Sequence, residues 1–310
     1  MIFKVLPMML RNRAERVPQK PLGPFKTDAA VYATAPASGL RVTWMGHSSM
    51  LVEIDGARVL VDPVWDERAS PMQWMGPKRF FAPTLSLEKL PKLDVVLVSH
   101  DHYDHLGEGT VRRLAELQPK ARWVTSLGVG PILEEFGVVA EQITELNWTE
   151  IVEVGGCAIT SLPSRHFSGR SAFNRFETLW GAFVLRGAGG HTVYFGADSG
   201  WWEGFAEIGA SHGPFDLTML EIGAYNDLWR QIHMGPDGAA RSFLDMGGAG
   251  LLMPIHWGLF DLALHAWQWP IERMLELAKV EGLKLWTPEP GQPTEVVRGV
   301  EVRSDWWMNG

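Results

Sequence analysis

The chain has 310 residues, of which 46% are hydrophobic and 21% are charged, so it can bury a large core. Its formal net charge of −8 at pH 7 disfavours a broad basic surface, and we expect no nucleic-acid partner. The single cysteine, Cys157, excludes an intramolecular disulfide and suits a reducing compartment, so we expect a cytoplasmic protein with a buried, unreactive thiol. The fifteen tryptophans fit either a wide apolar substrate pocket or the core.

The first twenty residues do not have the order of a secretory signal peptide, because the apolar residues precede the basic ones. The sequence contains no run of about 20 apolar residues that would span a membrane. We expect residues 1–40 to form an N-terminal arm that either caps the domain or touches a membrane surface peripherally. Since no linker or change in composition follows, residues 41–310 are predicted to form a single domain.

Short apolar runs alternate with turn signals after residue 40. The dipeptide Asp55-Gly56 separates two such runs and predicts a hairpin turn. Strands are expected at residues 40–46, 49–55, 58–63, 94–100, 122–128, 149–156, 157–164, 180–187, 191–200, 216–224 and 250–258. Helices are expected at residues 109–118, 236–248 and 271–282. This alternation of β and α units predicts an α/β layered sandwich.

Histidine and aspartate residues follow several of these strands. The segment "VSHDHYDHLG", residues 98–107, begins at the end of an apolar strand and holds three histidines and two aspartates. His166, Asp198 and His256 follow three later strands. Because the carboxyl ends of strands in layered α/β proteins converge on one crevice, we expect these side chains to form a metal site.

The number of ligands indicates two metal ions. Five imidazoles and two carboxylates exceed the three protein ligands of one catalytic zinc, and they suit two divalent ions that share a carboxylate. Nitrogen-rich ligation favours zinc, although iron or manganese would also be accepted. Two ions about 3.5–4 Å apart would lower the pKa of a shared water and stabilise charge on the reacting oxygens.

The segment "HDHYDH" is similar to the HxHxDH signature of the metallo-β-lactamase superfamily. Other segments look like the branch of N-acylphosphatidylethanolamine-hydrolysing phospholipases D, namely residues 42–65, 68–80, 195–201, 213–217, 222–225 and 255–258. The resemblance covers most of the chain, from about residue 42 to residue 278. It implies a four-layer αβ/βα sandwich.

The resemblance also implies roles for individual residues. It implies seven ligands for the two ions: His100, His102 and His166 on the first, Asp104, His105 and His256 on the second, and Asp198 between them. His47 and Asp62 would orient metal-bound imidazoles, or else be a buried hydrogen-bonded histidine and a turn-capping aspartate. His233 would face the scissile phosphate and donate a proton, or else only begin the next helix. No pattern supports a role for His191, His212 or His265.

The segment "SPMQWMGPKRFF", residues 70–81, contains too many turn formers for a regular strand or helix. It either packs over the edge of the sandwich or forms the wall of a substrate pocket. In a pocket wall, its apolar side chains, including Phe81, would line an acyl-chain groove, and its basic side chains would lie near a phosphate. If the segment forms a pocket wall, the predicted pocket residues from it are Trp74, Met75, Lys78, Arg79 and Phe80. Tyr225, in the segment "IGAY", is a further predicted pocket residue.

The resemblance implies hydrolysis of a lipid or small-molecule phosphodiester, of phospholipase D type, by a hydroxide that bridges the metals. The products would be a phosphatidic acid and an alcohol such as an N-acylethanolamine. One alternative is a lactonase that opens a sugar-phosphate lactone or another lactone with the same metal site. A second alternative is a non-catalytic scaffold that only binds metal. The sequence leaves the oligomeric state open.

Overall fold

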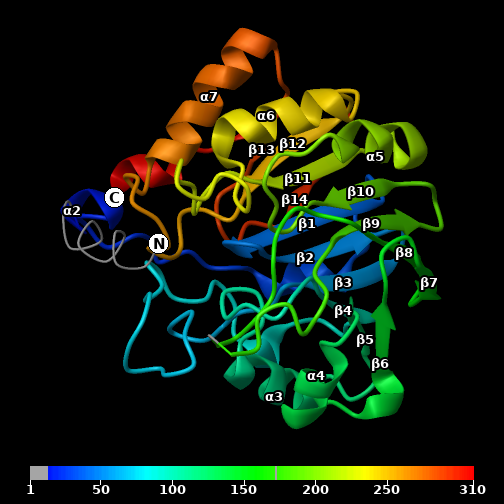
Figure 1. Ribbon diagram of the computed structural model, residues 1–310. Coiled ribbons are helices and arrows are strands. Elements are labelled where there is room, and N and C mark those ends of the chain that lie inside the picture. Colours follow the sequence, from blue (N-terminus) through cyan, green and yellow to red (C-terminus); the bar gives the residue numbers. More distant parts are fainter. Residues whose placement is uncertain (1–12, 172) are drawn as a thin grey trace.

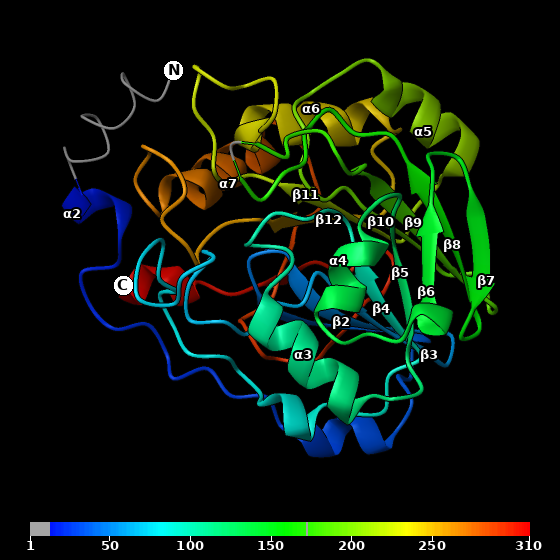
Figure 2. The ribbon, with the colours of Figure 1, turned by 60° about the horizontal axis from the view of Figure 1, so that its bottom comes forward.

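Two β-sheets pack face to face, and helices cover their outer faces (Figures 1 and 2). The computed structural model describes residues 13–171 and 173–310. Within this range the first sheet has the strand order β14-β1-β2-β3-β4-β5-β6, and the second has the order β12-β11-β10-β9-β8-β7. The short strands β13 and β15 pair separately.

The eleven strands and three helices that the sequence predicts are present close to their predicted positions, and the described residues form four further strands and three further α-helices that it does not predict. The first sheet comprises β1 (Leu40–Gly46), β2 (Ser49–Ile54), β3 (Ala57–Val61), β4 (Val95–Val98), β5 (Arg122–Ser126), β6 (Ile143–Leu146) and β14 (Thr294–Glu295). The second comprises β7 (Ile151–Val154), β8 (Cys157–Leu162), β9 (Ala182–Gly187), β10 (Thr192–Phe195), β11 (Leu217–Glu221) and β12 (Leu251–Ile255). The small pair is β13 (Trp286–Thr287) and β15 (Val302–Arg303). The α-helices are α2 (Arg13–Arg16), α3 (Glu108–Leu117), α4 (Gly130–Glu135), α5 (Gly204–His212), α6 (Gly235–Asp245) and α7 (Trp269–Glu281).

The alternation of side chains on β4 explains why this strand is apolar throughout. Val95 and Leu97 belong to the core between the two sheets, whereas Val96 and Val98 belong to the core beneath α3 and α4. Val111 and Leu114, three residues apart on α3, bury one face of that helix in the same outer core. Helices α5 and α6 cover the second sheet, and α7 packs against α6. The predicted four-layer αβ/βα sandwich is therefore confirmed.

The predicted hairpin turn joins β2 to β3. Asp55 and Gly56 both have positive φ angles, of 49° and 94°, and Ile54 pairs with Ala57 across the turn. Two consecutive positive φ angles are typical of the type I′ turn, whose twist matches that of the flanking strands. The turn therefore sets the register of the hairpin that leads into the metal-site edge of the sheet.

Tryptophan builds much of the core at the C-terminal side of the molecule. Trp306 is only 5% exposed, and its ring centroid lies 5.1–6.4 Å from those of six neighbours. These neighbours are Phe25, Trp44, Phe81, Trp257, Trp267 and Trp307. For these tryptophans the structure supports the core interpretation, because edge-to-face and stacked contacts replace contact with solvent.

The described part of the N-terminal arm packs on the domain. The Arg16 guanidinium is buried, donates to the carbonyl oxygen of Ala263 at 3.2 Å and lies 3.4 Å from the Asp261 carboxylate. The Tyr32 hydroxyl donates to Thr43 Oγ1 of β1 at 2.8 Å. These contacts agree with the alternative in which residues 13–40 cap the domain. The alternative of membrane contact also depends on residues 1–12, which lie outside the described residues. Among the described residues, no helix combines the length and hydropathy of a membrane span.

Replacement of Trp306 by alanine is expected to lower the free energy of unfolding by about 3–5 kcal/mol, because it leaves a large cavity among the aromatic rings. Trp74→Ala is the matched control, since this side chain is 74% exposed, and it should change the value by less than about 0.5 kcal/mol. Urea unfolding followed by circular dichroism measures both values. Equal effects of the two substitutions would contradict a core role for Trp306.

Candidate metal centre

Four strands from both sheets deliver polar side chains to one edge of the sandwich. Asp62 follows β3, His100 follows β4, Asp198 follows β10 and His256 follows β12, and none of them is more than 2% exposed. Charged groups this deeply buried need partners of opposite charge, since an isolated buried charge is strongly unfavourable.

The backbone at this edge adopts left-handed conformations at non-glycine residues. The φ angles are 56° at His47, 39° at Asp62, 47° at Ala197 and 61° at His256. Each such residue costs about 1–3 kcal/mol, and strain of this kind is typical of functional sites. The strain bends the chain just after β3, β10 and β12, so that their following side chains turn into the centre.

Three imidazole nitrogens form a first group of ligands. His102 Nδ1 lies 3.0 Å from His100 Nε2 and 3.2 Å from His166 Nε2. The other nitrogens of two rings are held in place: His166 Nδ1 donates to the carbonyl oxygen of Ile232 at 2.8 Å, and His100 Nδ1 lies 2.9 Å from Ser99 Oγ. Neighbouring ligands of a tetrahedral zinc stand about 3.3 Å apart, so the three nitrogens have the spacing of ligands to one ion.

Two further imidazoles and two carboxylates form a second group. His256 Nε2 lies 3.2 Å from Asp104 Oδ2 and 3.1 Å from Asp198 Oδ1. His105 Nε2 lies 3.2 Å from the same Asp198 oxygen and 3.7 Å from Asp104 Oδ2. This group has two nitrogen and two oxygen donors, a set that zinc, iron and manganese all accept.

The Asp198 carboxylate joins the two groups. Its Oδ2 lies 3.8 Å from His100 Nε2 and 3.6 Å from His166 Nε2, while its Oδ1 faces the second group. Asp198 Oδ1 and His105 Nε2 are buried and find no hydrogen-bond partner among residues 13–171 and 173–310. Two ligand-type atoms that face each other without a hydrogen bond have the arrangement expected of two ligands of one metal ion. The residues present therefore fit a site for two ions, with Asp198 between the two groups of ligands.

Protons and metal ions compete for this centre. Burial alone would raise the pKa of Asp198, but the charge on His105 and His256 lowers it well below its usual range. Burial alone would lower the pKa of His256. The Asp198 and Asp104 carboxylates outweigh this effect and raise the pKa of His256 to about 10. Burial lowers the pKa of His100 well below its usual range, so this imidazole is neutral and ready to bind a cation. Divalent ions would replace the protons on the second group.

Asp62 and His47 lie directly behind the ligands. Asp62 Oδ2 accepts from His105 Nδ1 at 2.6 Å, and the Asp62 carboxylate also accepts from the Ser99 main-chain N–H and hydroxyl. This contact leaves His105 Nε2 to face the centre, as the predicted orienting role of Asp62 requires. His47 Nε2 instead lies 3.0 Å from Asp104 Oδ2. The hydrogen bond of this ring nitrogen therefore goes to a candidate carboxylate ligand and not to the ring of a candidate histidine ligand.

A glutamate that the sequence interpretation missed supports His233. Glu221, the last residue of β11, is fully buried and accepts from His233 Nδ1 at 2.5 Å and from the Met234 main-chain N–H at 2.6 Å. The ring of His233 lies 5.1 Å from that of His166 and 5.2 Å from that of His256. The position of Glu221 at a strand end is the same signal that identified Asp198, and it could have found this residue.

The loop of residues 70–81 carries two basic residues of the predicted pocket wall. Arg79 is buried and donates to the main-chain oxygens of Phe81 at 2.8 Å and Trp65 at 3.0 Å, so it fastens the loop. Lys78 is exposed and pairs with Glu67 at 2.6 Å. Both cations thus already have partners within the protein, and the phosphate contact of these two residues stays a prediction.

The apolar pocket candidates separate into two sets. Trp74 and Met75 are 74% and 49% exposed on the surface of the loop. Phe80 lines a narrow pocket that also contains His256, and Tyr225 lines a neighbouring cleft. Only the second set lies in hollows next to the metal centre.

The fold and the site together define the class of the protein: a four-layer αβ/βα sandwich whose edge carries two adjoining groups of histidine and aspartate ligands. Residues 57–257 match the family described as "Beta-lactamase superfamily domain". The chain belongs to the metallo-β-lactamase superfamily and is a metal-dependent hydrolase.

Known proteins resemble the chain at different levels. It is 43% identical over 302 residues to an uncharacterised protein of Mycobacterium tuberculosis, which covers 97% of this chain and 79% of that protein. It is 38% identical over 235 residues to the N-acyl-phosphatidylethanolamine-hydrolyzing phospholipase D 1 of Caenorhabditis elegans, which covers 73% of this chain and 65% of that protein. The crystal structure of an isothiocyanate hydrolase from Delia radicum gut bacteria superposes with a TM-score of 0.65 at 19% identity, over 83% of this chain and 99% of that one, and shows the shared fold.

Asp62→Ala is expected to lower the affinity for the second metal ion roughly 10–100-fold, because His105 loses the acceptor that orients it. Metal titration followed by calorimetry and elemental analysis measures the loss. Asp55→Ala is the matched control, since Asp55 accepts from His191 Nδ1 at 2.7 Å at the distant hairpin turn. Unchanged metal binding in Asp62→Ala would contradict the orienting role.

Proposed function

We propose that the chain is a phosphodiesterase of the phospholipase D type, with substrates related to N-acylphosphatidylethanolamine. The observation that carries this proposal is the exposed apolar surface on two loops beside the candidate metal ligands. The similarity to the phospholipase D of Caenorhabditis elegans supports the same substrate class. A lactonase for small sugar phosphates has no comparable need for large exposed apolar side chains.

The two loops border one hollow next to the ligand segment. Trp74 stands on the first loop, and Phe173 and Phe176, which are 96% and 61% exposed, stand on the second. The hollow is lined by Gln73 from the first loop, by Arg170 from the second loop and by Tyr103. In the sequence, Tyr103 comes between the ligand candidates His102 and Asp104. Exposed aromatic side chains in this position would contact the acyl chains of an aggregated lipid.

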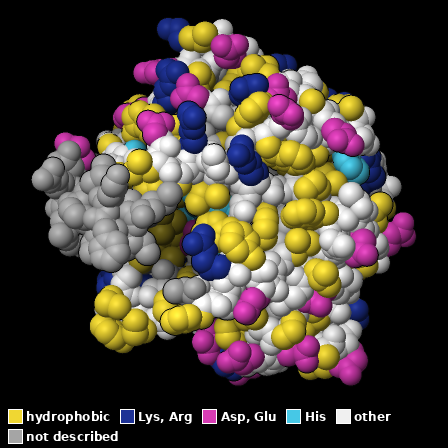
Figure 3. Space-filling view, viewed as in Figure 1, with side chains coloured by type: hydrophobic (Ala, Val, Ile, Leu, Met, Phe, Trp, Pro, Cys, Tyr) yellow, Lys and Arg dark blue, Asp and Glu magenta, His cyan; other side chains and the backbone are white. Residues whose placement is uncertain are grey.

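Basic side chains accompany these apolar ones. The Arg175 guanidinium lies over the ring of Phe167 at 4.7 Å and over that of Phe176 at 5.5 Å. Figure 3 shows apolar side chains together with Lys and Arg side chains around a hollow in which histidine is visible. Mixed apolar and cationic surfaces suit the boundary between acyl chains and anionic head groups.

The proposed chemistry uses the ligand set together with His233. Two divalent ions bound here would activate a water as the nucleophile and stabilise negative charge on the phosphoryl oxygens. Glu221 accepts from His233 Nδ1, which leaves Nε2 as the atom that gives a proton to the departing alcohol oxygen. Glu221 acts as a positioning residue, because its hydrogen bond to Nδ1 fixes the orientation of the His233 ring.

Metal-loaded protein is expected to convert N-acylphosphatidylethanolamine in mixed micelles into phosphatidic acid and N-acylethanolamine, and mass spectrometry measures both products. Asp198→Asn is expected to lose at least about 100-fold of this activity, because the proposed bridge between the two groups is weakened. Turnover of a lactone without turnover of any phosphodiester would favour the lactonase. Full metal loading without any turnover would favour the scaffold.

His233→Ala is expected to lower kcat roughly 100-fold or more for a diester with an alkyl alcohol as leaving group, because this oxygen needs a proton as the bond breaks. The loss should be much smaller for a p-nitrophenyl diester, whose leaving group departs as a stable anion. Stopped-assay kinetics on the two substrates measure the difference, and His212→Ala on α5 is the remote control. An equal loss on both substrates would contradict proton donation by His233.

A further inference from the structure

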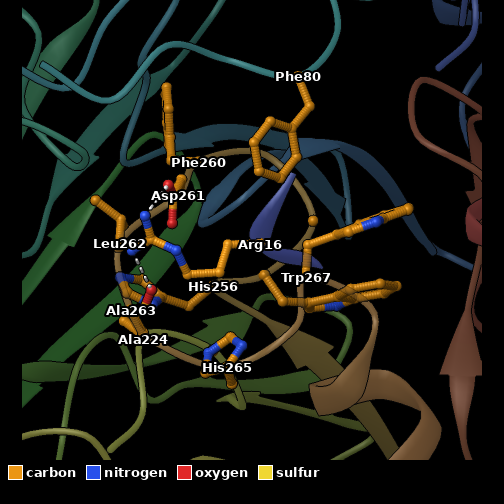
Figure 4. A pocket seen from close by; sticks show the side chains of 13 residues that line it. Arg16, Phe80, Ala224, His256, Phe260, Asp261, Leu262, Ala263, His265 and Trp267 are labelled. Carbon is orange, nitrogen blue, oxygen red and sulfur yellow. Dashed lines mark hydrogen bonds and ion pairs between the residues drawn. The ribbon is translucent and has the colours of Figure 1, made fainter. Parts of the chain in front are cut away.

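His265 stands where two hollows beside the metal centre meet. It lines the narrow pocket that contains the ligand candidate His256, and it also lines an outer cleft of about 330 Å³. Figure 4 shows His265 and His256 in the narrow pocket, together with Arg16 and Phe80. A group that enters from the outer cleft towards the metal centre would therefore pass His265.

The hydrogen bonding of His265 leaves one nitrogen available. His265 Nδ1 lies 2.9 Å from the carbonyl oxygen of Ala266, to which it donates. His265 Nε2 is buried and has no hydrogen-bond partner among the described residues. Burial lowers the pKa of His265, and nearby charge on His233 and Arg16 lowers it further, so the ring is neutral. In this tautomer Nε2 is an acceptor, and a buried acceptor without a donor is unfavourable.

The walls of the outer cleft suit a flat group. The Tyr225 ring is stacked with that of Trp269 at a centroid distance of 6.1 Å, and the His265 ring lies 5.6 Å from Trp269. The nearby polar groups are already engaged: the Tyr225 hydroxyl donates to Asp227, which also lines the cleft, and Asp261 pairs with Arg16. Beside the aromatic surface, the cleft offers His265 Nε2 as a neutral acceptor, a combination that matches a planar amide with its N–H.

His265 lies on the side of the metal centre from which the leaving group would depart. His265 and His256 line the same pocket, and the ring of His233 lies 5.2 Å from that of His256, so this pocket is on the His233 side of the centre. If His233 protonates the departing oxygen, the alcohol that carries this oxygen extends away from phosphorus on the His233 side.

We propose that His265 Nε2 accepts a hydrogen bond from an amide N–H of the leaving alcohol, and that the outer cleft lined by Tyr225, His265 and Trp269 is the leaving-group subsite. This inference rests on the proposed phosphodiesterase function and deepens it. His265 is thus a specificity-determining residue, which selects N-acylated amino alcohols over alcohols that lack a donor at this position.

The experiment pairs two enzymes with two substrates that differ by one atom group. The substrates are dioctanoylphosphatidyl diesters of N-acetylethanolamine and of ethylene glycol monoacetate, in which an ester oxygen replaces the amide N–H. In the wild type, kcat/KM for the amide should exceed that for the ester roughly 5–10-fold, the value of one buried hydrogen bond. In His265→Phe this ratio should fall to about 1.

Further variants keep the result interpretable. His265→Gln retains an acceptor and should recover part of the ratio, while His212→Phe, on α5 far from the cleft, should keep the wild-type ratio. Metal content and the thermal transition of each variant show that it is folded. A ratio that is the same in wild type and His265→Phe overturns the inference.

The outcome separates this inference from the proposed function. Bis(p-nitrophenyl) phosphate, which has no amide, reports the metal-dependent diesterase activity of the wild type alone. Turnover of this compound with an unchanged amide-to-ester ratio refutes the subsite and leaves the phosphodiesterase standing. No turnover of any of the three diesters by metal-loaded wild type refutes the proposed function itself.

Discussion

The shared carboxylate of Asp198 is the interaction on which the rest of the structure depends. Its two oxygens face two different groups of ligands, in a place where almost no solvent reaches either of them. A carboxylate buried in this way is stable only beside positive charge, which protons on His105 and His256 or divalent ions supply. Four strand ends surround it, and those of β3, β10 and β12 are followed by left-handed residues.

Two candidate ligand rings and the ring of His233 are held by acceptors that lie behind them. Asp62 fixes His105, the carbonyl oxygen of Ile232 fixes His166, and Glu221 fixes His233. Each contact selects the ring nitrogen that is left to face the centre, so the chemistry of the site is decided one hydrogen bond away from it. The sandwich provides rigid support for Asp62 and Glu221, because Asp62 directly follows β3 and Glu221 ends β11.

The loops, rather than the ligand set, carry the exposed aromatic side chains on which the proposed substrate class depends. The fold alone is shared with an isothiocyanate hydrolase, with a TM-score of 0.65. In this chain, loops 70–81 and 167–180 expose aromatic side chains, while the segment 258–269 walls the cleft beside His256. Since the rigid edge of the sandwich fixes the metal ligands, these loops can change without loss of the hydrolytic centre.

The sequence by itself determined the elements and most of the centre. Short apolar runs between turn signals located the strands, Asp55-Gly56 located the turn, and the residues of "HDHYDH" after β4 indicated the ligands. These features are local, so they can be read without knowing which strands are neighbours. Only the tertiary structure decided the roles of Glu221, Arg79 and His265, because each depends on residues brought together by folding: His233 for Glu221, the carbonyl oxygen of Trp65 for Arg79, and two adjoining hollows for His265. Whether a polar side chain is already satisfied is a property of its neighbours in space, and the sequence does not show those neighbours.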